Sequence, residues 1–308
     1  MFRRDCNFPA SEFSEARKTQ RFRNICFVLV LLVSGAPALF CGDSVHTVPD
    51  ALPQDIPFKL YQGYVVVLEG TLGNLPHQNL LLDTGTNPSM IDKSVAEKLG
   101  LKGSSQSLML FNKTLSAQGV FLPNLQFGPV NRRNAVVIVS DFSNVGAGLG
   151  THIDAVIGLD ILGATNFTLD FEKQRLRFRS SPEHFSSPFT TRQNLITVDM
   201  KTGGRQLRLL FDTGTPRLVL FKDSLRQLDY ERTPLVGSGK NISGTVPFQM
   251  ILLPQAKFGT QDVGPQRASV VDSQQRVEND YDGLIGISCL HPKRLSFDFD
   301  RQVLTWSN

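Results

Sequence analysis

Leu81-Leu82-Asp83-Thr84-Gly85-Thr86 returns later in the chain as Leu210-Phe211-Asp212-Thr213-Gly214-Thr215, at an offset of 129 residues. Four further segments recur in the same order, at offsets of 128 to 131: Met90–Leu99 with Val219–Leu228, Leu122–Gly128 with Leu253–Gly259, Asp154–Gly158 with Asp282–Gly286, and Leu169–Leu176 with Phe297–Leu304. Five matches in one order indicate an internal duplication, so every motif has to be interpreted as one of a pair.

The sequence between the repeated motifs favours strands. Runs of β-branched residues, Leu and Phe, such as 63–68 and 134–139, are broken by Gly, Pro or Asn. Gly73-Asn74 and Gly203-Gly204 stand where a hairpin would return the chain into each Asp-Thr-Gly segment. Each copy is therefore predicted to be a mainly β lobe with one or two short helices. Residues 180–189, rich in Ser and Pro, are predicted to be an exposed linker between lobes at 55–179 and 190–308.

The composition is that of an ordinary globular protein, with 308 residues, 41% apolar, 19% charged and a net charge of +4. Most of the excess positive charge lies in residues 1–38, which hold six basic and three acidic side chains. The remaining chain has 26 basic and 25 acidic residues. A nearly neutral folded part gives no support for binding to nucleic acid or to an anionic membrane surface.

The first 38 residues resemble a secretory leader. The basic cluster 17–23 precedes the apolar run 25–33, and Ala36-Pro37-Ala38 offers a small-residue cleavage site. The run is short for a membrane-spanning helix, which needs about 20 residues. We therefore expect cleavage after Ala38 and a secreted or periplasmic protein, with a retained membrane anchor as the alternative. Of the four cysteines, only Cys41 and Cys289 would remain, and a buried Cys289 is expected instead of a disulfide framework.

A single Asp-Thr-Gly would most simply be a surface turn. Here each triplet follows three apolar residues, 80–82 and 209–211, so each carboxylate is predicted to end a buried strand. Burying a charge is costly unless the charge is paired or used. Two such strands, one per repeat, would bring Asp83 and Asp212 together at the interface between the lobes.

With these paired motifs, the sequence resembles the pepsin and retropepsin superfamily of aspartic peptidases over about residues 60–308. The resemblance implies two similar acid-protease β-barrel lobes related by a pseudo-twofold axis, with Asp83 and Asp212 as the catalytic pair. It also assigns roles to neighbouring residues. Thr84 and Thr213 would bond across to the opposite lobe, Gly85 and Gly214 would let the loops approach, and Gly158 and Gly286 would end the strands threaded behind them.

The implied reaction is hydrolysis of peptide bonds in a peptide or protein substrate. Two carboxylates this close share one proton, so one acts as a base toward water and the other as an acid. Neither a metal nor an organic cofactor is needed, and a monomer is expected because one chain encodes both aspartates. A catalytically weak or inactive peptide-binding module of the same fold is the alternative.

Two further expectations concern loops and pH. The region 102–121, where a flap would cover the substrate, contains no Tyr, unlike that of pepsins, and the glycine-rich stretch 146–150 is expected to be a flexible loop. Thr86 and Thr215 carry hydroxyls that could donate hydrogen bonds to the two aspartates. Donation to an ionised carboxylate lowers its pKa, so activity is expected to fall as the pH rises toward neutral, while burial would raise both pKa values and oppose the threonines.

Overall fold

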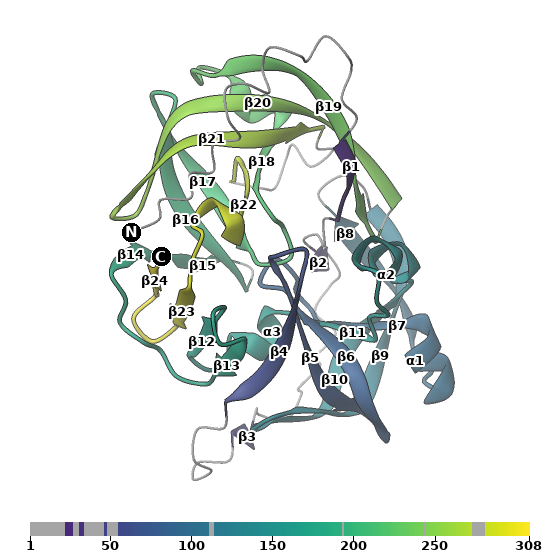
Figure 1. The fold of residues 1–308 in the computed structure, drawn as a ribbon. Coiled ribbons are helices and arrows are strands. Elements are labelled where there is room, and N and C mark those ends of the chain that lie inside the picture. The colour runs from purple at the N-terminus through teal and green to yellow at the C-terminus, as the bar shows by residue number, and fades with distance from the viewer. Residues whose placement is uncertain are drawn as a thin grey trace.

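The computed structural model describes residues 22–26, 31–33, 46–47, 55–110, 114–192, 194–242, 244–272 and 281–308. Two β lobes lie one above the other in Figure 1, the N-terminal lobe below and the C-terminal lobe above, with a shared sheet at one side. The mainly β, two-lobed architecture expected from the duplication is confirmed.

Six strands of the N-terminal lobe pair in a closed circuit, in the order β5-β6-β11-β7-β10-β9 and back to β5. Their bounds are β5 Val65–Leu72, β6 Leu75–Leu82, β7 Met90–Asp92, β9 Thr114–Phe127, β10 Val130–Ser140 and β11 Ala155–Ile157. Strand β8, Ser104–Leu110, forms a hairpin with β9. Three short helices complete the lobe, α1 Lys93–Lys98, α2 Ser143–Leu149 and α3 Leu159–Leu162.

The C-terminal lobe repeats this circuit strand for strand, as β16-β17-β22-β18-β21-β20 and back to β16. The bounds are β16 Leu195–Thr202, β17 Arg205–Asp212, β18 Leu218–Phe221, β20 Gly244–Phe258, β21 Gln261–Val271 and β22 Gly283–Gly286. Strand β19, Glu231–Asn241, pairs with β20 as β8 does with β9. Strand β15, Thr190–Arg192, and two 3-10 helices, η2 Lys222–Leu225 and η3 Ile287–Cys289, complete the lobe.

A shared sheet joins the two lobes, in the order β4-β13-β12-β23-β24-β14. Its strands are β4 Ile56–Tyr61, β12 Phe167–Asp170, β13 Arg175–Arg177, β14 Phe185–Pro188, β23 Arg294–Asp298 and β24 Val303–Ser307. At its centre Thr168 lies opposite Ser296, its own counterpart in the repeat. Antiparallel pairing of equivalent residues places an approximate twofold axis between these two strands.

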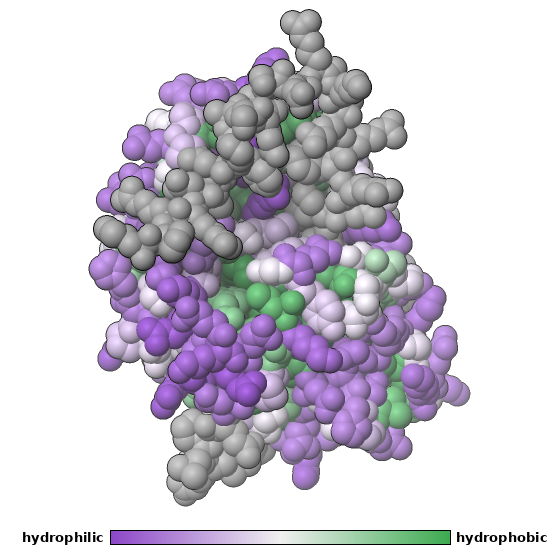
Figure 2. Space-filling model, viewed as in Figure 1, coloured by the Kyte–Doolittle hydropathy of each residue, from purple (hydrophilic) through white to green (hydrophobic). Residues whose placement is uncertain are grey.

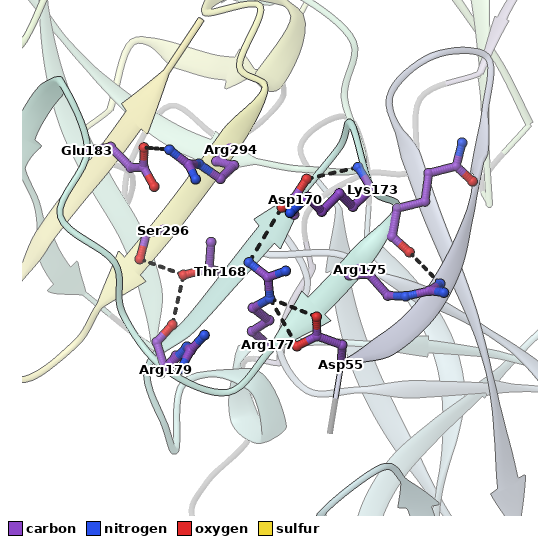
Figure 3. A network of polar contacts seen from close by, with 11 residues as sticks. Asp55, Thr168, Asp170, Lys173, Arg175, Arg177, Arg179, Glu183, Arg294 and Ser296 are labelled. Atoms are coloured by element: carbon purple, nitrogen blue, oxygen red, sulfur yellow. Dashed lines mark hydrogen bonds and ion pairs between the residues drawn. The ribbon is translucent and has the colours of Figure 1, made fainter. Parts of the chain in front are cut away.

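Polar side chains tie the connector between the lobes to this sheet, as Figure 3 shows around Thr168 and Ser296. The Thr168 hydroxyl lies 2.9 Å from the Ser296 hydroxyl, which also accepts a hydrogen bond from Ser181 N at 2.8 Å. Glu183, in the same connector, pairs with Arg294 at 2.9 Å. The expectation of a wholly exposed linker at 180–189 is therefore corrected, because 185–188 form the edge strand β14, a position that tolerates Pro188.

Most of the leader expected at 1–38 lies outside the described residues. The structure describes three short strands before residue 55: β1 Phe22–Cys26 beside β19, β2 Leu31–Val33 beside β8, and β3 His46–Thr47 beside β10. None of the helices in the described ranges is long and apolar enough to cross a membrane. The glycine-rich stretch 146–150 is not a loop as expected, because 143–149 form α2.

Stacked aromatic rings connect the shared sheet to the strand that carries Asp212. Phe297 of β23 is fully buried, and its ring lies 4.4 Å from that of Phe167 on β12, centroid to centroid. It also meets Phe211 of β17 edge to face at 5.8 Å. Phe211 directly precedes Asp212, so the packing of the shared sheet supports the end of that strand.

We expect Phe297→Ala to lower the free energy of unfolding by about 3–5 kcal/mol, because it removes a fully buried ring and leaves a cavity in this stack. Urea unfolding followed by tryptophan fluorescence measures the change. Val236→Ala is the control, because Val236 is 49% exposed and should change stability by no more than about 0.5 kcal/mol. Equal effects of the two substitutions would contradict the role given to the stack.

Candidate active site

Equivalent strands deliver the two aspartates to the interface between the lobes. Asp83 follows β6 and Asp212 ends β17, and each of these strands pairs in parallel with a short buried strand, β11 or β22. The amide of Asp83 donates to Ile157 O at 3.0 Å, which fixes where the strand ends. Both aspartates are fully buried.

Thr84 and Thr213 join the two lobes through reciprocal hydrogen bonds. The Thr84 hydroxyl donates to Phe211 O at 2.8 Å and accepts from Thr213 N at 3.1 Å. The Thr213 hydroxyl donates to Leu82 O at 3.2 Å and accepts from Thr84 N at 3.0 Å. Each buried hydroxyl thus donates one hydrogen bond to the backbone of the other lobe and accepts one from it. These are the bonds between the lobes that the resemblance implied.

Glycines allow the two loops to approach. A Cβ atom added to Gly85 would lie 2.6 Å from the carboxyl carbon of Asp212, so the Asp83 loop reaches the opposite carboxylate only because position 85 has no side chain. A Cβ on Gly158 would lie 2.3 Å from Thr86 O, and one on Gly286 would lie 2.1 Å from Thr215 O. The strands behind the loops are therefore packed against them at backbone contact distance.

The two carboxylates receive different numbers of hydrogen bonds. Asp83 accepts two, from Gly85 N to Oδ1 and from the Thr86 hydroxyl to Oδ2, both at 2.8 Å. Asp212 Oδ1 accepts one from Gly214 N at 2.7 Å. Within the described residues, Asp212 Oδ2 and the Thr215 hydroxyl have no partner at hydrogen-bonding distance and angle, although Thr215 lies near enough to Asp212 to lower its pKa. Thr86 therefore makes a well-formed hydrogen bond to its aspartate, whereas Thr215 makes only a looser contact.

Burial has the largest effect on the pKa values of Asp83 and Asp212. It raises the pKa of Asp83, against the lowering effect of the neighbouring Asp212 carboxyl, the Thr86 hydroxyl and the amides of Gly85 and Gly214. Burial also raises the pKa of Asp212, and the charge of Asp83 acts in the same direction. Both threonine hydroxyls act in the lowering direction, and burial outweighs them at both positions.

A second repeated pair of aspartates, which sequence reasoning left without a role, fixes the strands behind the site. Asp154 accepts a hydrogen bond from Asn79 N at 2.8 Å, and Asp282 accepts one from Arg208 N at 3.0 Å. Asp154 therefore holds the middle of β6, and Asp282 holds the middle of β17. Their recurrence in the matched segments 154–158 and 282–286 was the available clue.

Each lobe contributes a long hairpin, β8–β9 and β19–β20. Hairpin β8–β9 contains most of the region 102–121 that was expected to form a flap. Hairpin β19–β20 was not expected, although its strands belong to the second copy of the repeat. Ile242, at the turn of the second, lines a depression of about 640 Å³ together with Leu108, Leu115 and Ala117 of the first. The two hairpins thus meet across the lobes. In Figure 2, apolar surface gathers near the middle of the face shown, between the two lobes.

Two pseudo-symmetric β lobes with a buried aspartate from each, joined by reciprocal threonine bonds, define the bilobed aspartic peptidase architecture. The sequence model of the aspartyl protease family matches the chain twice, over residues 68–161 and 198–289. Each match contains one Asp-Thr-Gly segment, and together they cover more than half of the chain, so the chain belongs to this family. No curated protein sequence matches it. Among the described residues, no three His, Cys, Asp or Glu side chains gather as metal ligands would.

The reciprocal bonds predict a specific stability loss. Thr84→Val removes the hydroxyl but keeps the shape, leaving Phe211 O and Thr213 N without a partner in a buried site. Since each unsatisfied buried group costs about 1–3 kcal/mol, we expect a loss of at least about 2 kcal/mol in urea unfolding. Thr84→Ser keeps the hydroxyl and should lose less than half as much. A valine variant as stable as the serine variant would show that these bonds do not hold the lobes together.

Proposed function

We propose that the protein is an aspartic endopeptidase that hydrolyses peptide bonds with a water molecule activated between Asp83 and Asp212. One observation carries this proposal. Two fully buried carboxylates, delivered by equivalent strands of two lobes, lie close enough for the glycine loop of one to touch the other. Such burial is costly, and a shared proton used in catalysis explains why both are kept.

The unequal hydrogen bonding supports different roles for the two aspartates. Asp83 accepts two hydrogen bonds, which favour its ionised form, so it is proposed as the general base. Asp212 accepts only one hydrogen bond in good geometry, and burial and the nearby charge of Asp83 raise its pKa, so it is proposed to carry the shared proton as the general acid. Because the two groups titrate as a pair, each measured pKa belongs to both.

In the proposed reaction, Asp83 takes a proton from water, and the water oxygen forms a bond to the scissile carbonyl carbon. Asp212 donates its proton to the carbonyl oxygen, giving a neutral gem-diol intermediate. Asp83 then passes its proton to the leaving nitrogen while the C–N bond breaks, and Asp212 recovers its proton from the diol. The products are a carboxylic acid and an amine, and no metal or organic cofactor enters the balance.

The proposal also covers the kind of substrate, the location of the protein and its oligomeric state. The apolar surface between the lobes suits an extended peptide with apolar side chains. The basic and apolar leader in residues 17–33 supports a site of action outside the cytoplasm, either secreted, periplasmic or anchored if the leader is retained. Since one chain supplies both aspartates, the active unit is proposed to be a monomer.

We expect Asp83→Asn and Asp212→Asn each to reduce kcat/KM on an unfolded protein substrate by at least about 1000-fold, because each removes half of the acid–base pair. Peptide release measured by mass spectrometry gives the rate, and pepstatin-type inhibitors should block the wild-type activity. A non-catalytic binding module would bind peptide without releasing fragments. Fragment release that persists in both asparagine variants would exclude the two aspartates as the catalytic pair.

The pH profile should depend on Thr86 more than on Thr215. Activity requires ionised Asp83 and protonated Asp212, so it rises with pH through the lower pKa of the pair and falls through the upper one. Thr86→Ala removes a donor to ionised Asp83, which raises its pKa and moves the acidic limb of kcat/KM upward. Thr215→Ala should shift either limb less, because its hydroxyl lies outside hydrogen-bonding geometry and affects the pKa of Asp212 less than burial and the charge of Asp83 do. Equal shifts would contradict the assignment of roles.

A further inference from the structure

The N-terminal lobe contains a buried polar relay that the proposed mechanism does not use. Asp160, the second residue of α3, accepts two hydrogen bonds on Oδ1 from Ser89, one from its amide at 3.0 Å and one from its hydroxyl at 2.7 Å. Ser89 is fully buried. A carboxylate can only accept, so Asp160 fixes the Ser89 hydroxyl as a donor toward it.

The relay leads from Ser89 to the loop that holds Asp83. With its proton directed at Asp160, the Ser89 hydroxyl accepts a hydrogen bond from Gly158 N at 2.8 Å. Gly158 packs against Thr86 O, and the next residue, Leu159, donates its amide to the same oxygen at 2.9 Å. Thr86 in turn donates its hydroxyl to Asp83. Asp160 is thus connected to Asp83, the proposed base, through Ser89 and through the backbone of Gly158 and Leu159, which contacts Thr86.

The C-terminal lobe has no such relay at the equivalent positions. Leu218 and Ser288 occupy the places of Ser89 and Asp160 in the repeat. There the amide of Gly286 donates to Arg217 O at 3.0 Å, and the amide of Ser288 donates to Pro216 O at 3.2 Å, so backbone alone holds the loop. The lobe with the relay is the lobe whose threonine bonds to its aspartate.

We infer that Asp160 and Ser89 are positioning residues that hold Thr86 against Asp83 and so make Asp83 the ionised member of the pair. The inference rests on the proposed peptidase function for its kinetic consequences, but its structural consequence, the hydrogen bond from Thr86 to Asp83, is independent of turnover. The ionisable group acting directly on Asp83 is Asp212. Burial raises the pKa of Asp160, while its hydrogen bonds from Ser89 and the charge of Arg132 on β10 lower it.

The test uses Ser89→Ala, Asp160→Ala and Asp160→Asn, with Ser288→Ala as the matched control from the other lobe. Ser89→Ala and Asp160→Ala should each lower kcat about tenfold, as expected for the loss of one positioned hydrogen bond, with KM within about twofold. Both should move the acidic limb of the pH profile upward, as Thr86→Ala does, and add no further shift in a Thr86→Ala background. Asp160→Asn keeps an accepting oxygen for Ser89, so it should retain most of the wild-type activity that Asp160→Ala loses.

A second measurement separates this inference from the proposed function. Carboxyl carbon NMR titration of Asp83 should give a higher pKa in Ser89→Ala and in Asp160→Ala than in the wild type, and an unchanged pKa in Ser288→Ala, whether or not the protein cleaves peptides. Loss of wild-type activity in Asp83→Asn tests the peptidase function by itself. An Asp83 titration that stays the same in Ser89→Ala, or that moves equally in Ser288→Ala, would overturn the relay.

Discussion

The reciprocal hydrogen bonds of Thr84 and Thr213 are the interaction on which the site depends. Each hydroxyl bonds to the backbone of the opposite lobe, so neither loop is satisfied without its partner. An unpaired buried donor or acceptor costs more than a made bond gains, which makes separation of the lobes at this point unfavourable. The shared sheet, centred on Thr168 and Ser296, imposes the same twofold relation from one side of the molecule. The two contacts together fix the distance between the carboxylates.

That fixed, buried environment sets the acidity of the pair. Burial raises the pKa of both aspartates, and the charge of Asp83 also raises that of Asp212. The hydrogen bonds that Asp83 accepts act in the opposite direction without cancelling the effect of burial. A pair that holds one proton over a wide pH range is what acid–base cleavage of an amide needs. In the proposed reaction, the geometry of the scaffold would supply such a pair.

Duplication gave the two lobes the same strands, while polar substitutions made them different. The circuit of six strands, the glycine contacts behind the loops and the aspartates at 154 and 282 are repeated. The pair of Ser89 and Asp160 is not repeated, since apolar Leu218 and uncharged Ser288 stand in their places. An acid and a base are two different functions, and a strictly symmetric pair of loops would not assign them. The differences between the lobes therefore carry as much functional meaning as the likeness.

The sequence by itself determined the duplication, the β class and the two aspartates, because each follows from a local pattern that recurs at a fixed offset. The roles expected of Thr84, Thr213, Gly85 and Gly158 came from the resemblance to aspartic peptidases. It did not determine that 185–188 form an edge strand, that the stretch 146–150 belongs mostly to a helix, or that β19 and β20 extend as a second hairpin toward the first. Nor could it show that Thr86 makes a well-formed hydrogen bond to its aspartate while Thr215 does not, or that Asp160 bonds to Ser89, 71 residues away. These features depend on which side chains the folded chain brings within about 3 Å of each other. That proximity is set by long-range packing, which leaves no periodic trace in the sequence.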